Sequence, residues 1–232
     1  MESNLEKLEK TLRLKFNDKN LLRTAFIHRS YLNEHPEERL TNNERLEFLG
    51  DAVLGLVVSE TLYGRYPESP EGDLTNLRSS LVNAKTLSTA AASLGLGGYL
   101  HLSKGEEATG GRTRQYILAN TFEALVGAIF LDQGLPAVKK FLDSHLLLYL
   151  QEIIEKKLYK DFKSILQEKA QEELGVTPIY KIIEEKGPDH AKIFRTAVLV
   201  DKKRFADGEG SSKQEAEQQA AKAALENWPE RM

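Results

Sequence analysis

The chain has 232 residues, no cysteine, a formal net charge of −3, 41% hydrophobic residues and 29% charged residues. This composition is typical of a folded protein with one large or two smaller domains, and it excludes disulfides and cysteine-ligated zinc. The N-terminal segment has no apolar stretch of the kind found in secretory signals, and apolar runs such as 146–150 are too short to cross a bilayer. We therefore expect a cytoplasmic protein with no membrane partner and no organic cofactor.

Apolar residues recur at helical spacing through the first two thirds of the chain, and we predict an all-helical domain over residues 1–157. Either Asn17 or Asp18 is positioned to cap its first clear helix. A longer helix is expected to include residues 43–54, and another is expected to run from about Val138 to Lys157. These segments together carry enough apolar residues for one continuous core.

The pattern changes after residue 160, where shorter segments with strand-like alternation begin. The predicted elements are a helix between Asp161 and Gly175, strands over 178–185, 192–200 and around Arg204, and a helix from Ser211 or Ser212 to Trp228. The order α-β-β-β-α indicates a small α+β domain over residues 161–229. Its two helices should cover one face of an antiparallel sheet.

Acidic residues in two of the apolar helical segments are the strongest candidates for a functional site. Glu44, Glu47 and Asp51 lie at positions i, i+3 and i+7 of NERLEFLGDAVL, and therefore on one helical face. Asn120 and Glu123 lie at i and i+3 of a second apolar segment. Carboxylates on packed helices require a partner for their charge.

A divalent cation would satisfy several of these carboxylates at once. Oxygen ligands without cysteine or a histidine pair favour Mg²⁺ or Mn²⁺ over zinc. Such an ion beside a phosphate group would fit phosphodiester hydrolysis. The alternative is a solvated acidic helix face, which is the more frequent origin of this spacing, and Glu123 alone is more often a salt-bridge partner.

The segment NERLEFLGD resembles the signature of the ribonuclease III family. The similarity covers almost the whole chain and continues through YPESPEGDLTNLRSSLVN (66–83), LSKGEEATGGRTR (102–114) and ILANTFEALVGAIFLD (117–132). The chain looks like the bacterial form of the family, which has a single catalytic domain. The resemblance implies an all-α ribonuclease III endonuclease domain followed by an α+β double-stranded-RNA-binding domain.

The resemblance also implies a function and residue roles. It implies a homodimer that uses Mg²⁺, or Mn²⁺ in its place, to cleave double-stranded RNA in rRNA and mRNA processing, leaving 5′-phosphate and 3′-hydroxyl ends. The implied roles are metal ligands at Glu47, Asp51, Asn120 and Glu123, with Asp51 and Glu123 catalytic, groove acids at Glu44 and Glu71, and a dimer contact at Phe48. For Phe48, ordinary core packing is the alternative.

Position 120 departs from the family pattern, which has aspartate where this chain has asparagine. An amide oxygen can bind Mg²⁺ but contributes no negative charge, so we expect weaker metal binding and slower cleavage. One alternative function is therefore a dimer that binds double-stranded RNA and cuts it little or not at all. A third hypothesis, which sets the resemblance aside, is a helical metal-dependent phosphohydrolase acting on nucleotides.

Candidate RNA contacts lie in the second domain. Gln167 and Gln171 are one helical turn apart, His190 follows a Gly-Pro turn, and Ser212 with Lys213 begins the last helix. These groups suit the shallow minor groove and the phosphates of an RNA duplex. A solvated helix, a plain turn and an ordinary helix cap are the alternatives.

Residues 103–114 (SKGEEATGGRTR) indicate a polar, mobile loop in the first domain. Its Lys104, Arg112 and Arg114 are further candidates for phosphate contacts, weighed equally against a loop that is merely flexible.

Overall fold

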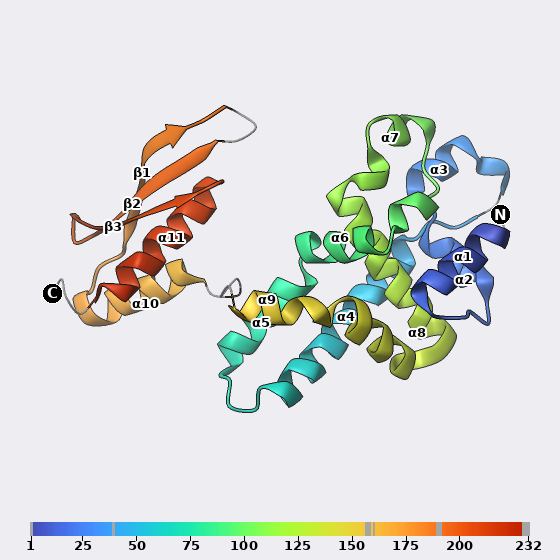
Figure 1. Cartoon of the computed structure of the whole chain (residues 1–232), viewed down its shortest axis with the longest axis horizontal. Coiled ribbons are helices and arrows are strands. Elements are labelled where there is room, and N and C mark those ends of the chain that lie inside the picture. The colour runs from blue at the N-terminus through green and yellow to red at the C-terminus, as the bar shows by residue number, and fades with distance from the viewer. Residues whose placement is uncertain (1, 39, 156–158, 160, 189–191, 229–232) are drawn as a thin grey trace. The chain divides into compact units, whose positions relative to one another are not determined.

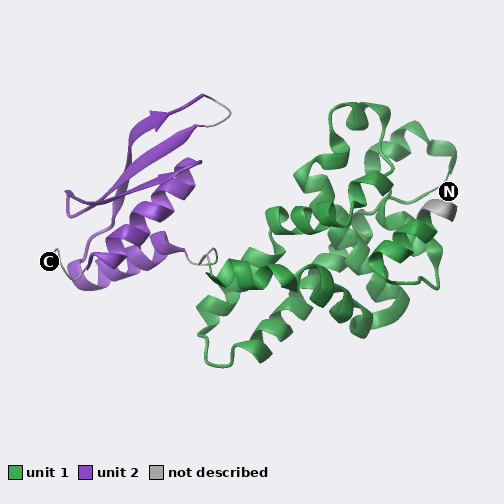
Figure 2. Ribbon diagram, in the orientation of Figure 1, with its two compact units in different colours: residues 1–159 green, residues 160–232 purple. Residues whose placement is uncertain are grey.

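The computed structural model describes residues 2–38, 40–155, 159, 161–188 and 192–228. The chain divides into two compact units, Met1–Tyr159 and Lys160–Met232 (Figure 1, Figure 2). Within the described residues the first unit is helical apart from one isolated bridge, and the second combines three strands with two helices. The predicted fold class, an all-α domain followed by an α+β domain, is confirmed.

The first unit is built from helices of very different lengths. In chain order they are α1 (Glu2–Leu12), α2 (Lys19–Ala25), α3 (Arg29–Glu34), η1 (Pro36–Glu38), α4 (Glu44–Arg65), α5 (Glu71–Val82), α6 (Ala84–Ser93), η2 (Leu96–Tyr99), α7 (Lys104–Ala108), η3 (Gly111–Thr113), α8 (Gln115–His145), η4 (Leu147–Tyr149) and α9 (Leu150–Glu155), where η marks a 3₁₀ helix. Asp18 caps α2, because its carboxylate accepts the N–H of Asn20 at 2.9 Å.

The prediction of one helix from Val138 to Lys157 is wrong. α8 ends at His145, and Leu146 has a non-helical backbone with φ −121°. The break has a packing reason, because Leu146, Leu147 and Leu150 are all buried in the core. The break changes the direction of the chain, so that α9 packs against α5 with Leu150 and Ile153 buried.

The prediction of a mobile loop at 103–114 is also wrong, since this segment forms α7 and η3. The Ser103 hydroxyl accepts the N–H of Glu106 at 3.1 Å and caps α7. Ser-x-x-Glu is the sequence pattern of a capping box, and this signal could have predicted the helix.

α4 and α8 form the centre of the first unit, and their backbones touch. A Cβ atom on Gly50 of α4 would lie 1.8 Å from the Glu123 carbonyl oxygen on α8. A Cβ atom on Gly127 of α8 would lie 2.2 Å from the Leu46 carbonyl oxygen on α4. Only glycine permits so close an approach, so these two positions set the spacing of the two helices.

α8 is also long and apolar enough to cross a membrane by length and composition. Half of its most apolar window is buried inside the structure. Phe122, Leu125 and Ile129, for example, are fully buried among the residues of the first core. These contacts are those of a core helix.

The second unit is an antiparallel sheet covered on one face by two helices (Figure 1). Its elements are α10 (Phe162–Leu174), β1 (Ile179–Lys186), β2 (Ile193–Val200), β3 (Lys203–Gly210) and α11 (Lys213–Glu226), with strand order β1-β2-β3. As predicted, α10 lies between Asp161 and Gly175, and Ser212 caps α11. Trp228 closes the core at 1% exposure, with its ring against Phe205 and its N–H donated to Glu173 at 2.6 Å.

The glycine contact between α4 and α8 predicts the effect of a single methyl group. Gly50→Ala should lower the melting temperature of the first unit by at least about 6 °C, because relieving the clash must separate the two helices. Gly64→Ala on the same helix is the control, since a Cβ there meets nothing within 4 Å and alanine favours the helix. Far-ultraviolet circular dichroism would measure both, and equal melting temperatures for the two variants would contradict the proposed contact.

Candidate active site

The α4–α8 contact brings Glu47 and Asp51 of α4 to Glu123 of α8. Burial, together with the negative charges of Asp51 and Glu47, raises the pKa of Glu123 to about 7. Burial also raises the pKa of Glu47, as do the charges of Glu44 and Asp51. Asp51 therefore lies within electrostatic reach of both Glu47 and Glu123.

Asn120 joins this group from α8, one turn before Glu123. Its side-chain amide lies close enough to the Glu47 carboxylate to act as a hydrogen-bond donor, and this partly offsets the rise in the pKa of Glu47. A carboxylate only accepts hydrogen bonds, so the amide N–H is the donor and the amide oxygen is left for another partner. An aspartate at position 120 could not make this bond when ionised.

The carboxylates face one another without forming a tight cluster. In the described part of the chain, the one set of acidic or histidine ligand atoms that all lie within 4.8 Å of one another is His35, Glu37 and Glu38, on a different part of the surface. Three like charges without a cation between them repel, and this repulsion favours a wider spacing of Glu47, Asp51 and Glu123.

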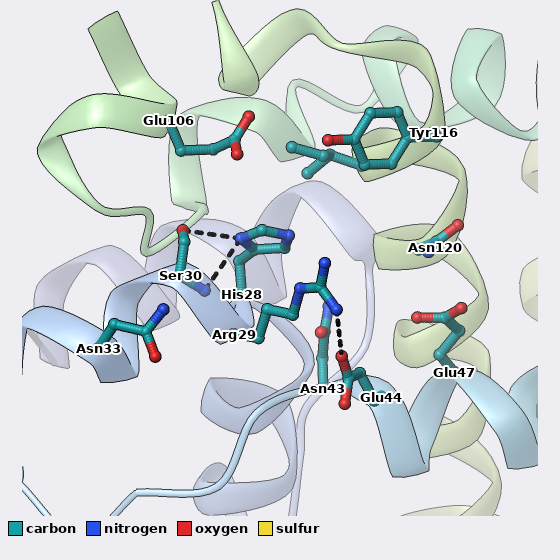
Figure 3. A pocket seen from close by; sticks show the side chains of 11 residues that line it. His28, Arg29, Ser30, Asn33, Asn43, Glu44, Glu47, Glu106, Tyr116 and Asn120 are labelled. Atoms are coloured by element: carbon teal, nitrogen blue, oxygen red, sulfur yellow. Dashed lines mark hydrogen bonds and ion pairs between the residues drawn. The ribbon is translucent and has the colours of Figure 1, made fainter. Parts of the chain in front are cut away.

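A pocket of about 550 Å³ opens beside this group (Figure 3). Glu44, Glu47 and Asn120 form one side of it, and the segment at the start of α3 forms another. Its full lining is His28, Arg29, Ser30, Asn33, Asn43, Glu44, Glu47, Glu106, Tyr116, Ile117 and Asn120. Of these residues, the sequence pattern had indicated only the two glutamates of α4 and Asn120.

Sequence reasoning missed the part of the pocket at His28, Arg29, Ser30 and Tyr116. His28 precedes α3 and caps it, since its Nδ1 accepts the N–H of Ser30 at 3.3 Å. Histidine is an infrequent N-cap, so this position carries no recognisable helix-start signal. Tyr116 lies one turn before Asn120 on α8, a spacing that could have placed both in one pocket.

The two predicted groove acids occupy different places within this chain. Glu44 lines the pocket beside Glu47, whereas Glu71 begins α5 and lines a separate groove with Leu56 and Tyr63. The structure therefore does not bring Glu71 to the carboxylates of α4 and α8 within one chain. A shared groove that includes Glu71 would need a second subunit.

Phe48 is 82% exposed and therefore is not a core residue. This finding excludes the alternative of ordinary core packing. The ring lies at the edge of a groove of mixed apolar and polar character that also includes Leu21, Leu49 and Leu131. An exposed aromatic ring beside leucine side chains in a groove is typical of a surface that another protein covers.

The predicted RNA contacts of the second unit differ in their availability. Gln167 and Gln171 are exposed on α10. The Ser212 hydroxyl accepts the N–H of Glu215, and Lys213 pairs loosely with Glu185 at 3.8 Å. A phosphate bound by Lys213 would have to replace its contact with Glu185. His190 lies outside the described residues.

The basic residues of 103–114 are mostly engaged within the protein. Arg112 donates to the carbonyl oxygens of Gly97 and Leu100 at 3.0 and 2.9 Å and pairs with Glu107. Arg114 pairs with Glu106 and donates to both oxygens of Thr109. These two arginines therefore hold the α7–η3 segment together, and a phosphate contact would compete with that role.

Comparison with known proteins gives the same assignment for both units. A family model described as Ribonuclease-III-like matches residues 18–150, and one described as the double-stranded RNA binding motif matches residues 162–227. The chain is 46% identical to ribonuclease 3 of Streptococcus equi subsp. zooepidemicus, over 94% of both chains. It is 47% identical to ribonuclease 3 of Streptococcus thermophilus, over 95% of this chain and 96% of that one. This chain belongs to the ribonuclease III family.

Solved structures agree with this assignment for the first unit. The nuclease domain of ribonuclease III from Campylobacter jejuni matches with a TM-score of 0.58 and 43% identity, over 62% of this chain and 96% of that domain. That structure was described for flexibility in a region involved in dimer formation. The ribonuclease III resemblance at residues 43–51 is thus confirmed by the fold of the first unit.

The raised pKa of Glu123 predicts how stability depends on pH in this ribonuclease III domain. In the unfolded chain the carboxyl ionises near 4.5, whereas in the folded domain it ionises near 7. Its stabilising contribution is therefore complete below about 4.5 and is lost as the pH rises through about 7. Glu123→Gln cannot ionise, so without metal its melting temperature should increasingly exceed that of the native chain across this window.

Melting curves over a pH series, recorded with a metal chelator, would measure this difference. Glu6→Gln, which removes an exposed carboxylate from α1, is the matched control. A difference between Glu123→Gln and the native chain that is the same at every pH would show that Glu123 does not ionise as described.

Proposed function

We propose that this chain is a homodimeric, Mg²⁺-dependent endonuclease that hydrolyses phosphodiester bonds of double-stranded RNA. The products would carry 5′-phosphate and 3′-hydroxyl ends, and the biological role would be rRNA and mRNA processing in the cytoplasm. The observation that carries this proposal is the meeting of Glu47, Asp51 and Glu123 at the contact of α4 and α8, with the pKa of Glu123 raised to about 7. The family assignment and the RNA-binding unit support it.

The donor set fits a divalent cation with a preference for oxygen. The charges that act on Glu47 and Glu123 are all acidic, and no basic side chain of the described residues is among them. A cation would supply the missing positive charge. Three carboxylates and the amide oxygen of Asn120 are ligands that Mg²⁺ accepts, and Mn²⁺ could take the same place.

When bound, such a metal would activate water and stabilise the charge that develops on the phosphate. Glu47, Asp51, Asn120 and Glu123 would hold it, with Asp51 and Glu123 nearest to the chemistry. Glu44 would line the cleavage groove, and Glu71 of a second subunit would complete it. These assignments follow the family pattern position by position.

The second unit would hold the duplex and deliver it to the nuclease unit. We propose that Gln167, Gln171 and His190 contact the minor groove and that Ser212 and Lys213 contact phosphates. Such binding reads the shape of the RNA duplex rather than its sequence. We also propose residues 1–157 and 161–229 as the limits of the two functional domains.

A cleavage assay on a long RNA duplex with Mg²⁺ tests the proposed function. The native chain should cut the duplex, whereas Glu123→Gln should reduce the rate at least about 100-fold while retaining duplex binding. Glu6→Gln, at an exposed position on α1, should cut at the native rate. Undiminished cleavage by Glu123→Gln would remove this residue from the proposed site.

Asn120 favours a second candidate function, a dimer that binds double-stranded RNA and barely cuts it. Asn120→Asp distinguishes the two, because it adds a charge to the metal ligands and removes the hydrogen bond to Glu47. We expect a lower Mg²⁺ midpoint for cleavage, together with a metal-free domain that is less stable by about 1–3 kcal/mol. If only the Asn120→Asp variant cuts RNA, the native chain is a binding protein.

The exposed ring of Phe48 predicts a dimer contact. Phe48→Ala should raise the dimer dissociation constant by about 30-fold or more, as expected for a central aromatic in an interface. The fold of each subunit should persist, because the ring is 82% exposed. Analytical ultracentrifugation measures the dissociation constant, with Leu174→Ala in the second unit as the control. Unchanged association of Phe48→Ala would place the interface elsewhere.

A further inference from the structure

The pocket beside the carboxylates extends well beyond the residues that would hold a metal. Glu44, Glu47 and Asn120 lie on one side, and the other lining residues include His28, Arg29, Tyr116 and Glu106 (Figure 3). Its volume of about 550 Å³ leaves room for more than a hydrated ion. A group bound there would lie directly next to the proposed cleavage centre.

Arg29 is the only lysine or arginine among the described residues that line this pocket. Its guanidinium is 74% exposed and reaches Glu44 at 3.8 Å, near the outer limit of an ion pair. An exposed pair at this distance contributes little stability, so the guanidinium is free to take a second partner. Arg114, by contrast, is held by Glu106 and Thr109.

A phosphate that entered this acidic pocket would be repelled by Glu44 and Glu47. A guanidinium offers five N–H donors in a planar fork, and it can contact a carboxylate with one edge and a phosphate with another. Arg29 could therefore keep its contact with Glu44 while neutralising a phosphate of the substrate. A lysine could supply the charge but not both edges.

His28 presents a donor to the same space. Its Nδ1 accepts the N–H of Ser30 at 3.3 Å, and the Ser30 hydroxyl lies 2.8 Å away on the same side. Burial lowers the pKa of His28, so the ring is neutral and carries its one proton on Nε2. In Figure 3 this second nitrogen lies on the side of the ring toward Tyr116 and Asn120.

We propose that this pocket is a subsite for the sugar–phosphate backbone of the RNA nucleotide next to the scissile bond. Arg29 positions its phosphate, and Nε2–H of His28 donates to its ribose 2′-hydroxyl. The subsite rests on the proposed function, because the scissile bond is placed by Glu47, Asp51 and Glu123. It deepens that function by adding a ribose-dependent contact that a DNA strand cannot make.

Duplex binding without metal tests the Arg29 contact independently of cleavage. Arg29→Ala should lower the slope of log affinity against log salt by about 1, the value for one lost phosphate contact. Arg65→Ala, which removes from the far end of α4 a half-exposed arginine that is also ion-paired with an acidic residue, is the matched control. An unchanged slope for Arg29→Ala would overturn the phosphate contact even if the protein cleaves RNA normally.

Cleavage of modified duplexes locates the contact. A neutral methylphosphonate at one phosphate flanking the scissile bond should slow the native chain about tenfold. The methylphosphonate should not slow the Arg29→Ala variant, because that variant has already lost the phosphate contact. On the unmodified duplex, Arg29→Lys should recover part of the native rate. If the methylphosphonate slows the native chain and the Arg29→Ala variant by the same factor at every flanking position, Arg29 does not contact a phosphate next to the scissile bond.

His28→Asn tests the ribose contact with the helix cap preserved. Asparagine accepts the N–H of Ser30 as an N-cap but lacks the imidazole Nε2–H. A single 2′-deoxy nucleotide next to the scissile bond should slow the native chain and leave His28→Asn unaffected, with equal melting temperatures for both proteins. An equal deoxy effect in both would exclude His28 as the donor.

Discussion

The direct contact of the α4 and α8 backbones at Gly50 and Gly127 is the constraint on which the nuclease unit depends. Each glycine lies against a carbonyl oxygen of the opposite helix. Glu47 and Asp51 flank Gly50 on α4, and the carbonyl oxygen that Gly50 contacts belongs to Glu123 on α8. The closest point of the core is therefore also the place where the acidic side chains meet, so packing and site geometry have a single origin.

The same contact imposes an electrostatic cost on the metal-free protein. It holds carboxylates beside one another under partial burial, and the raised pKa values of Glu47 and Glu123 express that cost. Asn120 reduces it by donating a hydrogen bond to Glu47, where an ionised aspartate would add to the repulsion. The amide of Asn120 thus stabilises the metal-free protein, whereas an aspartate at this position would stabilise the metal-bound protein.

Local signals in the sequence were sufficient to predict many of the helices and strands. The limits of α10 followed from Asp161 and Gly175, because a capping carboxylate and a left-handed glycine act within one turn of the chain. The carboxylates of α4 followed from helical spacing. By contrast, the α7–η3 segment was predicted as a loop because its glycines and charged residues are typical of loops. The Ser103–Glu106 capping pattern, which indicates a helix, was not used.

Properties that depend on tertiary packing were not available from the sequence. The exposure of Phe48, the engagement of Arg112 with carbonyl oxygens and the break at Leu146 are set by neighbours distant in the chain. The pocket at His28 and Arg29 is likewise lined by residues of α3, α4 and α8, which lie far apart in the sequence. The residue roles themselves came from the family resemblance, since spacing alone also fits a solvated helix face.

The burial of Trp228 makes this ribonuclease III convenient to observe one domain at a time. It is the only tryptophan of the chain, and it lies in the core of the RNA-binding unit against Phe205. Fluorescence excited selectively through the indole ring therefore reports on that unit alone, because the nuclease unit contains no tryptophan. The native sequence thus contains a built-in optical label that distinguishes the two domains without chemical modification.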